Sequence, residues 1–462
     1  MTQPSYSESL AQWIYGLNYD DLPETVREDA KLRILDILGT TLAASTLESS
    51  RVMRNGALAI APGDACHILG FGDPAEAAGA ALVNGTMAHA LDYDDTHLGS
   101  VVHISAPVVT TALTLGEMLQ ASGTALLTAV VAGAEIGCRI GSVAPKLFHQ
   151  QGYHATAVVG TFAATGTAAK MLNLDAQQTA NALGIAGSQS SGILQCFNDG
   201  TWTKQFHVGW SAHAAVIAAK LAQAGFTGPN EVLEGIQGFY KIYAASGKQY
   251  PERLLDALGS RWEYPTASFK PYPCGHVAHG FLDCILQLYD EEGLRANQVE
   301  AITCPIADWM IPIMCEPRDI KLQPKTDYHA KFSFPFTIAA ALTFGRLSVE
   351  AFSDDNIHDP ELLALAKKIM HVVDPSASTA VRFKGWVKVD TKDGRQLERI
   401  VEDSWGSDVN PMTPRQITEK FRDNAARVLP ESNIAAIVDQ VRLICDLSEV
   451  GDLVANCIAE TA

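Results

Sequence analysis

The sequence predicts a mainly α-helical protein that carries a smaller α+β part. Apolar residues recur with helical spacing from the start of the chain to about residue 265, a strand and a hairpin pattern follow, and the helical spacing then returns. With 462 residues, the chain is too long for one ordinary hydrophobic core. We therefore expect a large all-helical domain built from residues 1–265 and 406–462, with an inserted α+β domain at 266–405.

The first part of the chain has the pattern of a compact helical bundle. Val26, Ala30, Ile34 and Ile37 lie at helical spacing in "LPETVREDAKLRILDILGTTLAAS", just after acidic residues and a proline that are typical of a helix start. Later segments such as "GAALVNGTMAHAL" and "AVVGTFAATGTAAKML" are rich in alanine and glycine. Such small side chains let helices approach closely, so we expect many fully buried helices.

The pattern changes at "YPTASFKPYPCGH", which holds three prolines. "VEAITCPIADWMI" predicts a strand, and residues 381–400 alternate apolar and polar side chains around a turn at 392–394, which predicts a hairpin. Between them, "PFTIAAALTFGRL" and "DPELLALAKKIMHVV" are expected to be helices. This mixture predicts the α+β character.

Charge and composition exclude several classes of partner. The chain has 34 Lys and Arg against 52 Asp and Glu, a formal net charge of −18, which argues against nucleic acid or an anionic membrane as partner. The N-terminus lacks the basic and apolar regions of a signal peptide. The most apolar window contains Glu135 and Arg139, so it is expected to be a buried helix. Nine cysteines without any C-x-x-C spacing predict reduced thiols in a cytoplasmic protein.

One stretch, "AHALDYDDTH" at 88–97, crowds three aspartates and two histidines into an otherwise apolar run that has no lysine. If the preceding helix continues, Asp92 and Thr96 share one face with His89 one turn earlier, and the other aspartates cap the helix or face water. His103 follows in a loop, and a histidine beside a carboxylate is suited to general base catalysis. The alternative is a capped helix end with solvated aspartates and a hydrogen-bonded histidine.

Further basic residues interrupt apolar surroundings later in the chain. His154 follows Gly152 at the start of a small-residue helix, where free N–H groups favour anions. A second group, Lys204, His207 and Ser211, shares one helix face. A third group, Lys270, His276 and His279, surrounds a proline turn. Singly, such residues are usually surface lysines or hydrogen-bonded core histidines. Together they predict a basic pocket that binds substrate carboxylates and stabilises an enolate-like state.

Other chemistries lack support in the sequence. Zinc is the rival explanation for so many histidines, but no H-E-x-x-H or comparable ligand spacing is present. There is no G-x-G-x-x-G after a strand, no P-loop and no G-x-S-x-G elbow. We therefore expect neither a metal nor a cofactor.

Five segments occur in the order seen in one known family. "VNGTMAHALDYDDTH", "GYHATAVVGTFAA", "KQFHVGWSAHAA", "FKPYPCGHVAHG" and "HAKFSFPFTIAAAL" resemble the MmgE/PrpD family over nearly the whole chain. That family includes 2-methylcitrate dehydratase, cis-aconitate decarboxylase and iminodisuccinate epimerase. The resemblance implies a large helical domain with a smaller α+β domain, usually as a homodimer.

The resemblance also implies a set of site residues. His103 is expected to be the principal proton-transfer residue, and the catalytic and substrate-binding positions are His103, Asp92 and Lys204, and Thr96, His154, Lys270 and His276 respectively. The chemistries of the family share proton transfer at a carbon next to a carboxylate. We expect a metal-independent lyase, a dehydratase or decarboxylase, acting on a small di- or tricarboxylate. The alternatives are an epimerase of an amino or imino dicarboxylate and a non-catalytic carboxylate-binding protein.

Overall fold

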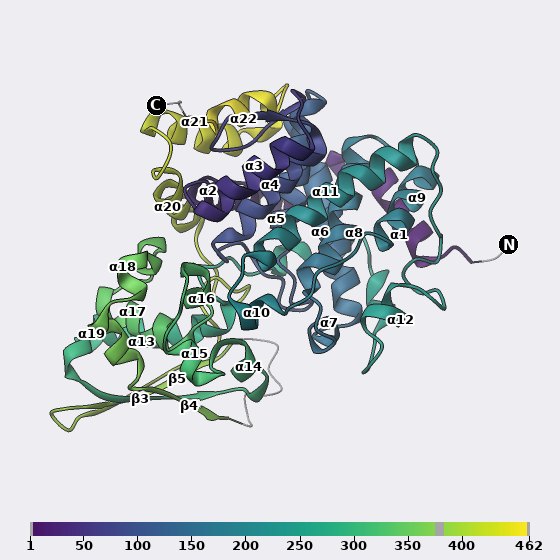
Figure 1. The fold of residues 1–462 in the computed structure, drawn as a ribbon. Helices are drawn as coiled ribbons and strands as arrows, with labels where there is room; N and C mark the ends of the chain where they lie inside the picture. Colours follow the sequence, from purple (N-terminus) through teal and green to yellow (C-terminus); the bar gives the residue numbers. More distant parts are fainter. Residues whose placement is uncertain (1–2, 375–382, 460–462) are drawn as a thin grey trace.

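The computed structural model describes residues 3–374 and 383–459 (Figure 1). It is mainly helical with a smaller part built on one mixed sheet, which confirms the predicted fold class. The helices of the helical part before residue 265 are α1 (Tyr6–Gly16), α2 (Glu24–Ala44), α3 (Glu48–Ile60), α4 (Ala77–Ala90), α5 (Ser105–Met118), α6 (Gly123–Val143), α7 (Leu147–Gln150), α8 (Ala155–Met171), α9 (Ala176–Gly187), α10 (Cys196–Asp199), α11 (Thr203–Gln223) and α12 (Phe239–Tyr243).

The C-terminal helices return to this helical part. Helix α20 (Pro414–Ala425) packs against α2, on its side toward the α+β part, and α21 (Glu431–Arg442) and α22 (Gly451–Asn456) lie at the top of Figure 1, away from the sheet. Phe421 on α20 belongs to the same buried cluster as Ile34 and Leu38 on α2. The contact is close, because a Cβ added at Gly39 would lie 3.1 Å from the Phe421 ring. The two ends of the chain therefore share one core, while the domain boundaries at 265/266 and 405/406 stay a prediction.

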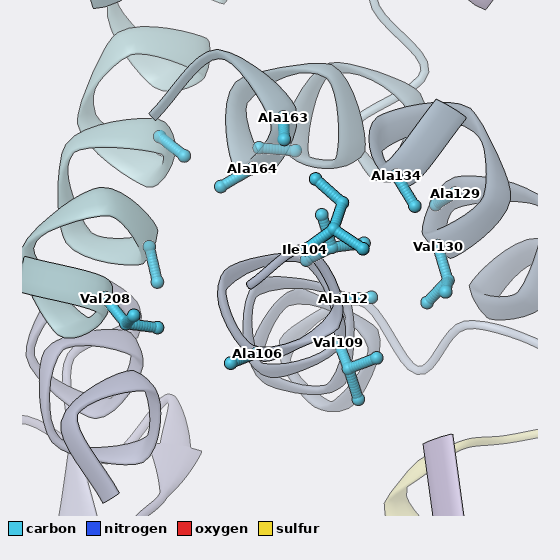
Figure 2. Packing of buried hydrophobic residues seen from close by; sticks show 14 of the residues in the cluster. Ile104, Ala106, Val109, Ala112, Ala129, Val130, Ala134, Ala163, Ala164 and Val208 are labelled. Atoms are coloured by element: carbon cyan, nitrogen blue, oxygen red, sulfur yellow. The ribbon is translucent and has the colours of Figure 1, made fainter. Parts of the chain in front are cut away.

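Small side chains allow the helices of this core to pack closely. Figure 2 shows α5, α6, α8 and α11 meeting through alanine and valine side chains. Helices α4 and α11 touch at two glycines, where a Cβ on Gly85 would lie 2.9 Å from the Gly209 Cα. His89 lies after this crossing on α4 and Lys204 lies before it on α11, so the helices run antiparallel and their two ends meet. This close approach positions the site.

Helix α6 is long and apolar enough to cross a membrane, by length and composition only. Every residue of its apolar window is buried inside the protein. The charged pair predicted to mark it as a core helix is intact, since Arg139 Nε donates to Glu135 Oε1 at 2.6 Å one turn away. Glu135 Oε2 also accepts from the backbone N–H of Glu263 and Tyr264. These contacts satisfy the carboxylate inside the core.

The α+β part contains one four-stranded sheet in the order β4-β3-β5-β6. Strand β3 (Val299–Ile306) pairs parallel with β4 (Ile369–Val373) and antiparallel with β5 (Gly385–Thr391), which pairs antiparallel with β6 (Gln396–Val401). Helices α13 (His279–Glu291) and α17 (Phe334–Phe344) form the main core with this sheet. Shorter helices complete this part: α14 (Ile311–Met314), α15 (Arg318–Lys321), α16 (Asp327–Lys331), α18 (Asp354–Ile357) and α19 (Pro360–Ala366).

Two expectations about secondary structure need correction. The segment 359–373 was expected to be one helix, but α19 ends at Ala366 and β4 follows, because its Ile and Val residues pair with β3. The helical part also holds two short paired strands, β1 (Cys66–His67) and β2 (Pro74–Ala75). The hairpin is confirmed as β5 and β6, although residues 381–382 of the predicted segment lie outside the described residues.

Candidate active site

The acidic stretch does not continue helix α4. The helix ends at Ala90, and Asp92 has a φ of 50°, so the predicted helical face shared by Asp92 and Thr96 does not exist. Thr96 instead pairs with Ser268, and each backbone N–H donates to the carbonyl of the other residue at 2.9 and 2.8 Å. The left-handed residue turns the chain so that successive aspartates point to different partners.

Asp92 lies between two lysines from distant parts of the chain. Lys204 Nζ donates to Asp92 Oδ1 at 2.6 Å, and Lys270 Nζ donates to Asp92 Oδ2 at 2.7 Å and to the Asp92 carbonyl at 2.8 Å. All three residues are almost completely buried. Burial alone would raise the pKa of the Asp92 carboxyl, but the two ammonium groups outweigh burial and hold that pKa well below its usual value.

A second carboxylate joins two histidines. His89 Nδ1 lies 2.9 Å from Asp94 Oδ2 and His89 Nε2 lies 2.7 Å from Lys204 Nζ, while His103 Nδ1 lies 3.5 Å from both Asp94 Oδ2 and Thr96 Oγ1. Burial holds the pKa of His103 well below its usual value although Asp94 opposes this, and burial raises the pKa of Asp94 although His103 opposes that. His103 is therefore a neutral imidazole at neutral pH, the form that a general base requires.

Asp95 holds in place the loop between α4 and α5, residues 91–104, which carries Asp92, Asp94 and His103. Its carboxylate accepts from Arg33 Nη1 at 2.7 Å, from Ser105 Oγ at 2.6 Å and from the Ser105 backbone N–H at 3.0 Å. Arg33 also donates to the carbonyl of Ala267, just before the segment that carries Lys270. The three aspartates are each at most 1% exposed, so the expectation that some of them face water is wrong.

We expect Arg33→Met to destabilise the protein by about 3–5 kcal/mol, because it leaves the buried Asp95 carboxylate without its cation. Equilibrium unfolding in urea measures this change. Arg33→Lys is the matched variant: it keeps the charge but loses the several N–H donors of the guanidinium, and it should fall between wild type and Arg33→Met. A loss below about 1 kcal/mol for Arg33→Met would show that this ion pair does not hold the loop.

His154 and His207 form a second imidazole pair beside the first. His154 is the N-cap of α8, as predicted, and its Nδ1 lies 3.2 Å from His207 Nδ1 on α11. The ring centroid of His154 lies 5.5 Å from that of His89 and 6.2 Å from that of His103. Burial lowers the pKa of His207 to about 3 and that of His154 well below its usual value. The imidazoles therefore form one neutral, buried group.

The α+β part contributes His276 and His279, which follow the proline turn. Their ring centroids are 4.5 Å apart, and both residues are buried. Neither ring nitrogen of His276 has a hydrogen-bond partner among the described residues, and the same holds for His279 Nδ1. Buried polar atoms are nearly always paired, so these imidazoles are suited to a ligand that reaches the site.

Three histidines of the cluster are close enough to be considered as a metal site. One ring nitrogen each from His89, His103 and His154 lies within 4.8 Å of the others. However, His89 contacts Asp94 through Nδ1 and the Lys204 ammonium through Nε2, so neither nitrogen is free to bind a metal. A metal ion here would also lie beside two ammonium groups. The residues fit an anion better than a cation, and the absence of a metal or cofactor stays a prediction.

The seven site residues expected from the sequence lie in one region. Asp92, Lys204 and Lys270 are in direct contact, and Thr96 and His103 are linked through their side chains. His154 packs by its ring against His103, and the charge of Lys270 acts on His276. His89 and Asp94 are not among the site residues expected from the sequence, although both lie within the crowded stretch that indicated the site.

A cavity of about 520 Å³ lies beside Tyr93, which is between Asp92 and Asp94 in the sequence. It is lined by Tyr93, Pro271 and residues of α20, and several of its charges are already paired, as in Lys420 with Asp36 and Arg427 with Glu350. Lys420 also donates to the Tyr93 carbonyl at 2.8 Å. The cavity has no histidine among its lining residues, so we assign the chemistry to the buried cluster.

The fold and the site together define a class of protein. It has a helical core to which the N-terminal and C-terminal helices both contribute, and a smaller α+β part. A buried cluster of lysine, histidine and aspartate side chains comes from these two parts. Within that class, the chain belongs to the MmgE/PrpD family. The MmgE/PrpD N-terminal domain matches residues 8–251, and the MmgE/PrpD C-terminal domain matches residues 272–443.

Relatives of known function align over nearly their whole length. The chain is 27% identical to the cis-aconitate decarboxylase of Aspergillus terreus, over 97% of this chain and 95% of that protein. It is 26% identical to the cis-aconitate decarboxylase of Homo sapiens, over 97% and 94%. It is 24% identical to the 2-methylcitrate dehydratase of Escherichia coli, over 93% and 92%. These named relatives are lyases, which supports an enzyme of the same general class.

Proposed function

We propose that this protein is a metal-independent lyase that acts on a small di- or tricarboxylate by proton transfer at a carbon next to a carboxylate. The observation that carries this proposal is the buried Asp92 carboxylate held between Lys204 and Lys270, beside neutral imidazoles. The relatives named above are a decarboxylase and a dehydratase, which supports the same class of substrate.

The two lysines supply the positive charge for the substrate. In a protein of net charge −18, an anionic substrate needs such a local group of cations. In the free protein Asp92 partly neutralises the lysines, so a substrate carboxylate competes with Asp92 for their N–H groups. Neither nitrogen of the neutral His276 ring has a partner among the described residues, so its one N–H can donate to a further carboxylate oxygen.

His103 is placed to move the proton. Its ring is 12% exposed, more than the nearby Asp94 carboxylate, and its neutral form can accept a proton from carbon. Asp94 lies 3.5 Å from His103 Nδ1 and would stabilise the imidazolium that forms. The Lys204 and Lys270 ammonium groups would stabilise the negative charge that develops on the adjacent carboxylate.

We expect Lys204→Met and Lys270→Met each to weaken substrate binding by about 1.5–3 kcal/mol, or about 10- to 150-fold in Kd, because each removes a charge-assisted hydrogen bond. Calorimetric titration measures the change. Lys321→Met is the matched control, since Lys321 is also buried but donates to the Ile313 carbonyl in the α+β part. Unchanged Kd in both site variants would place the substrate elsewhere.

The function is tested by incubating the protein in D2O with 2-methylcitrate, citrate, cis-aconitate and iminodisuccinate, with NMR detection. A new alkene or released CO2 supports the lyase. Inversion with deuterium at the stereocentre and no elimination product would instead show the epimerase, which needs acid and base groups on two faces of the carbon. Binding without turnover would show a carboxylate-binding protein.

The same reaction tests metal independence. Activity should persist after exhaustive chelation, since the Lys204 ammonium contacts the His89 nitrogen that a metal would need. Activity that disappears on chelation and returns with zinc or iron would overturn this part of the proposal.

A further inference from the structure

Helix α16 carries a buried tyrosine, Tyr328, which is not one of the site residues described above. Tyr328 is 3% exposed, and its hydroxyl has no hydrogen-bond partner among the described residues. The helix is anchored at its start, where Thr326 Oγ1 accepts from the backbone N–H of His329 at 3.1 Å. Tyr328 therefore lies on a fixed helix with a hydroxyl that the protein itself leaves unused.

The surroundings of Tyr328 connect it to the active site. Its ring centroid lies 5.4 Å from that of Phe332, and the Lys204 ammonium lies 5.1 Å from the centroid of the same Phe332 ring. The tyrosine ring and the lysine ammonium therefore both contact the Phe332 ring. Burial raises the pKa of Tyr328 well above its usual value, and the charges of Asp92 and Asp94 raise it further. The phenol is therefore protonated at neutral pH and has an O–H that it can donate.

Four other buried tyrosines show how unusual this hydroxyl is. The hydroxyls of Tyr93, Tyr240 and Tyr272 donate to the Pro271 carbonyl, the Ile140 carbonyl and Asp283, and Tyr264 pairs with Ser105. An unpaired buried hydroxyl lowers folding stability because its desolvation is not compensated. Among the described residues of the α+β part, His276 and His279 also have unpaired ring nitrogens, and these face a ligand in the proposed function; His329 Nε2 and Trp309 Nε1 are unpaired too.

We propose that Tyr328 is a catalytic residue whose hydroxyl donates a hydrogen bond to a substrate carboxylate oxygen. Negative charge develops on this oxygen when the adjacent carbon loses its proton, so the hydrogen bond is stronger in the transition state than in the bound substrate. No covalent bond forms, and the phenol keeps its proton. This inference rests on the proposed function, and it adds a hydrogen-bond donor from the α+β part to the site.

The test compares Tyr328→Phe with the control Tyr240→Phe, which loses a hydroxyl that is hydrogen-bonded within the helical core. In Tyr328→Phe we expect kcat to fall about 100-fold with little change in KM, and the thermal unfolding temperature to stay equal or rise. In Tyr240→Phe we expect unchanged kcat and a lower unfolding temperature, because a satisfied hydrogen bond is lost.

Wild-type kcat in Tyr328→Phe would overturn the inference, as would a fall in kcat accompanied by a lower unfolding temperature, which indicates a structural role. If wild type binds the four carboxylates without converting them, only the proposed reaction fails. The Kd of Tyr328→Phe then decides: weaker binding keeps the tyrosine in the site, and unchanged binding removes it. Wild type that neither binds nor converts any of them overturns the proposed function and this role together.

Discussion

Lowering the pH from 7.5 to 5 is expected to destabilise this protein strongly, because its core holds many neutral histidines. Burial lowers the pKa of His97 to about 4 and that of His207 to about 3. Five more buried histidines have a pKa well below the usual value: His89, His103, His154, His276 and His279. All seven bind a proton more readily in the unfolded chain than in the folded protein.

The sign of the effect follows from this difference. A histidine whose folded-state pKa is depressed contributes its full stability above the unfolded pKa of about 6.5, and that stability is lost as the pH falls below 6.5. With a folded pKa of about 4, as for His97, the loss at pH 5 is about 2 kcal/mol. Several such losses together reach the 5–15 kcal/mol that typically stabilises a folded domain.

Buried carboxyls oppose this effect in part. Burial raises the pKa of Asp36 and of Asp283 to about 6, so each binds a proton more readily in the folded protein. Each therefore restores about 1.4 kcal/mol on going from pH 7.5 to 5. Burial also raises the pKa of Asp29, Asp94 and Glu135. The histidines outnumber these carboxyls, so the net change is a loss of stability.

Urea unfolding at pH values from 7.5 to 5 measures this loss. His97→Gln separates the histidine contribution, because it should reduce the slope of unfolding free energy against pH by up to about 1.4 kcal/mol per pH unit between pH 6.5 and 4. The slope is compared rather than the absolute stability, since His97 also contacts Ser100. An unfolding free energy that stays constant from pH 7 to pH 5 would contradict the expectation.

The second large effect concerns catalysis. We expect His103→Ala to lower kcat by 10² or more, within the range of about 10²–10⁴ that a general acid or base contributes, while folding stays intact. The reason is that His103 is the neutral imidazole beside Asp94 and Thr96 and is more exposed than His89 or His154. Steady-state turnover of whichever carboxylate proves to be the substrate measures the effect.

His213→Ala is the matched control for this change. His213 lies on α11 and is partly buried, as His103 is, but its ring contacts the Ala78 carbonyl and Trp210 instead of the site. Its removal should leave kcat near wild type. Near-wild-type turnover in His103→Ala would remove His103 from the mechanism, and the His154–His207 pair would become the next candidate.

The parts of the fold that local sequence determines were predictable. Apolar side chains recur at helical spacing in α2 and alternate with polar side chains in β5 and β6, because one face of each element is buried. These spacings can be read from the sequence. The edge strand β4 was missed because "DPELLALAKKIMHVV" begins as a helix, and only its pairing with β3 makes the second half a strand. That pairing depends on residues more than 60 positions away, which no local window contains.

The candidate site was predictable in membership but not in geometry. Charged residues inside apolar runs identified Asp92, Lys204 and Lys270, because burying such groups needs partners. The sequence did not reveal that Asp92 adopts a left-handed conformation or that it contacts both lysines. Tyr328 gave no signal, since a single tyrosine in a short helix looks like any core residue, and only its unpaired hydroxyl distinguishes it.

The packing of α20 against α2 has a consequence for synthesis of the protein. Gly39 and Asp36 on α2 contact Phe421 and Lys420, which a ribosome adds about 380 residues later. Until then, this face of α2 has no native partner and leaves apolar side chains and the Asp36 carboxylate uncovered. Because contacts between sequence-distant residues form slowly and exposed apolar faces aggregate, we expect this face of α2 to need protection in the nascent chain until α20 emerges.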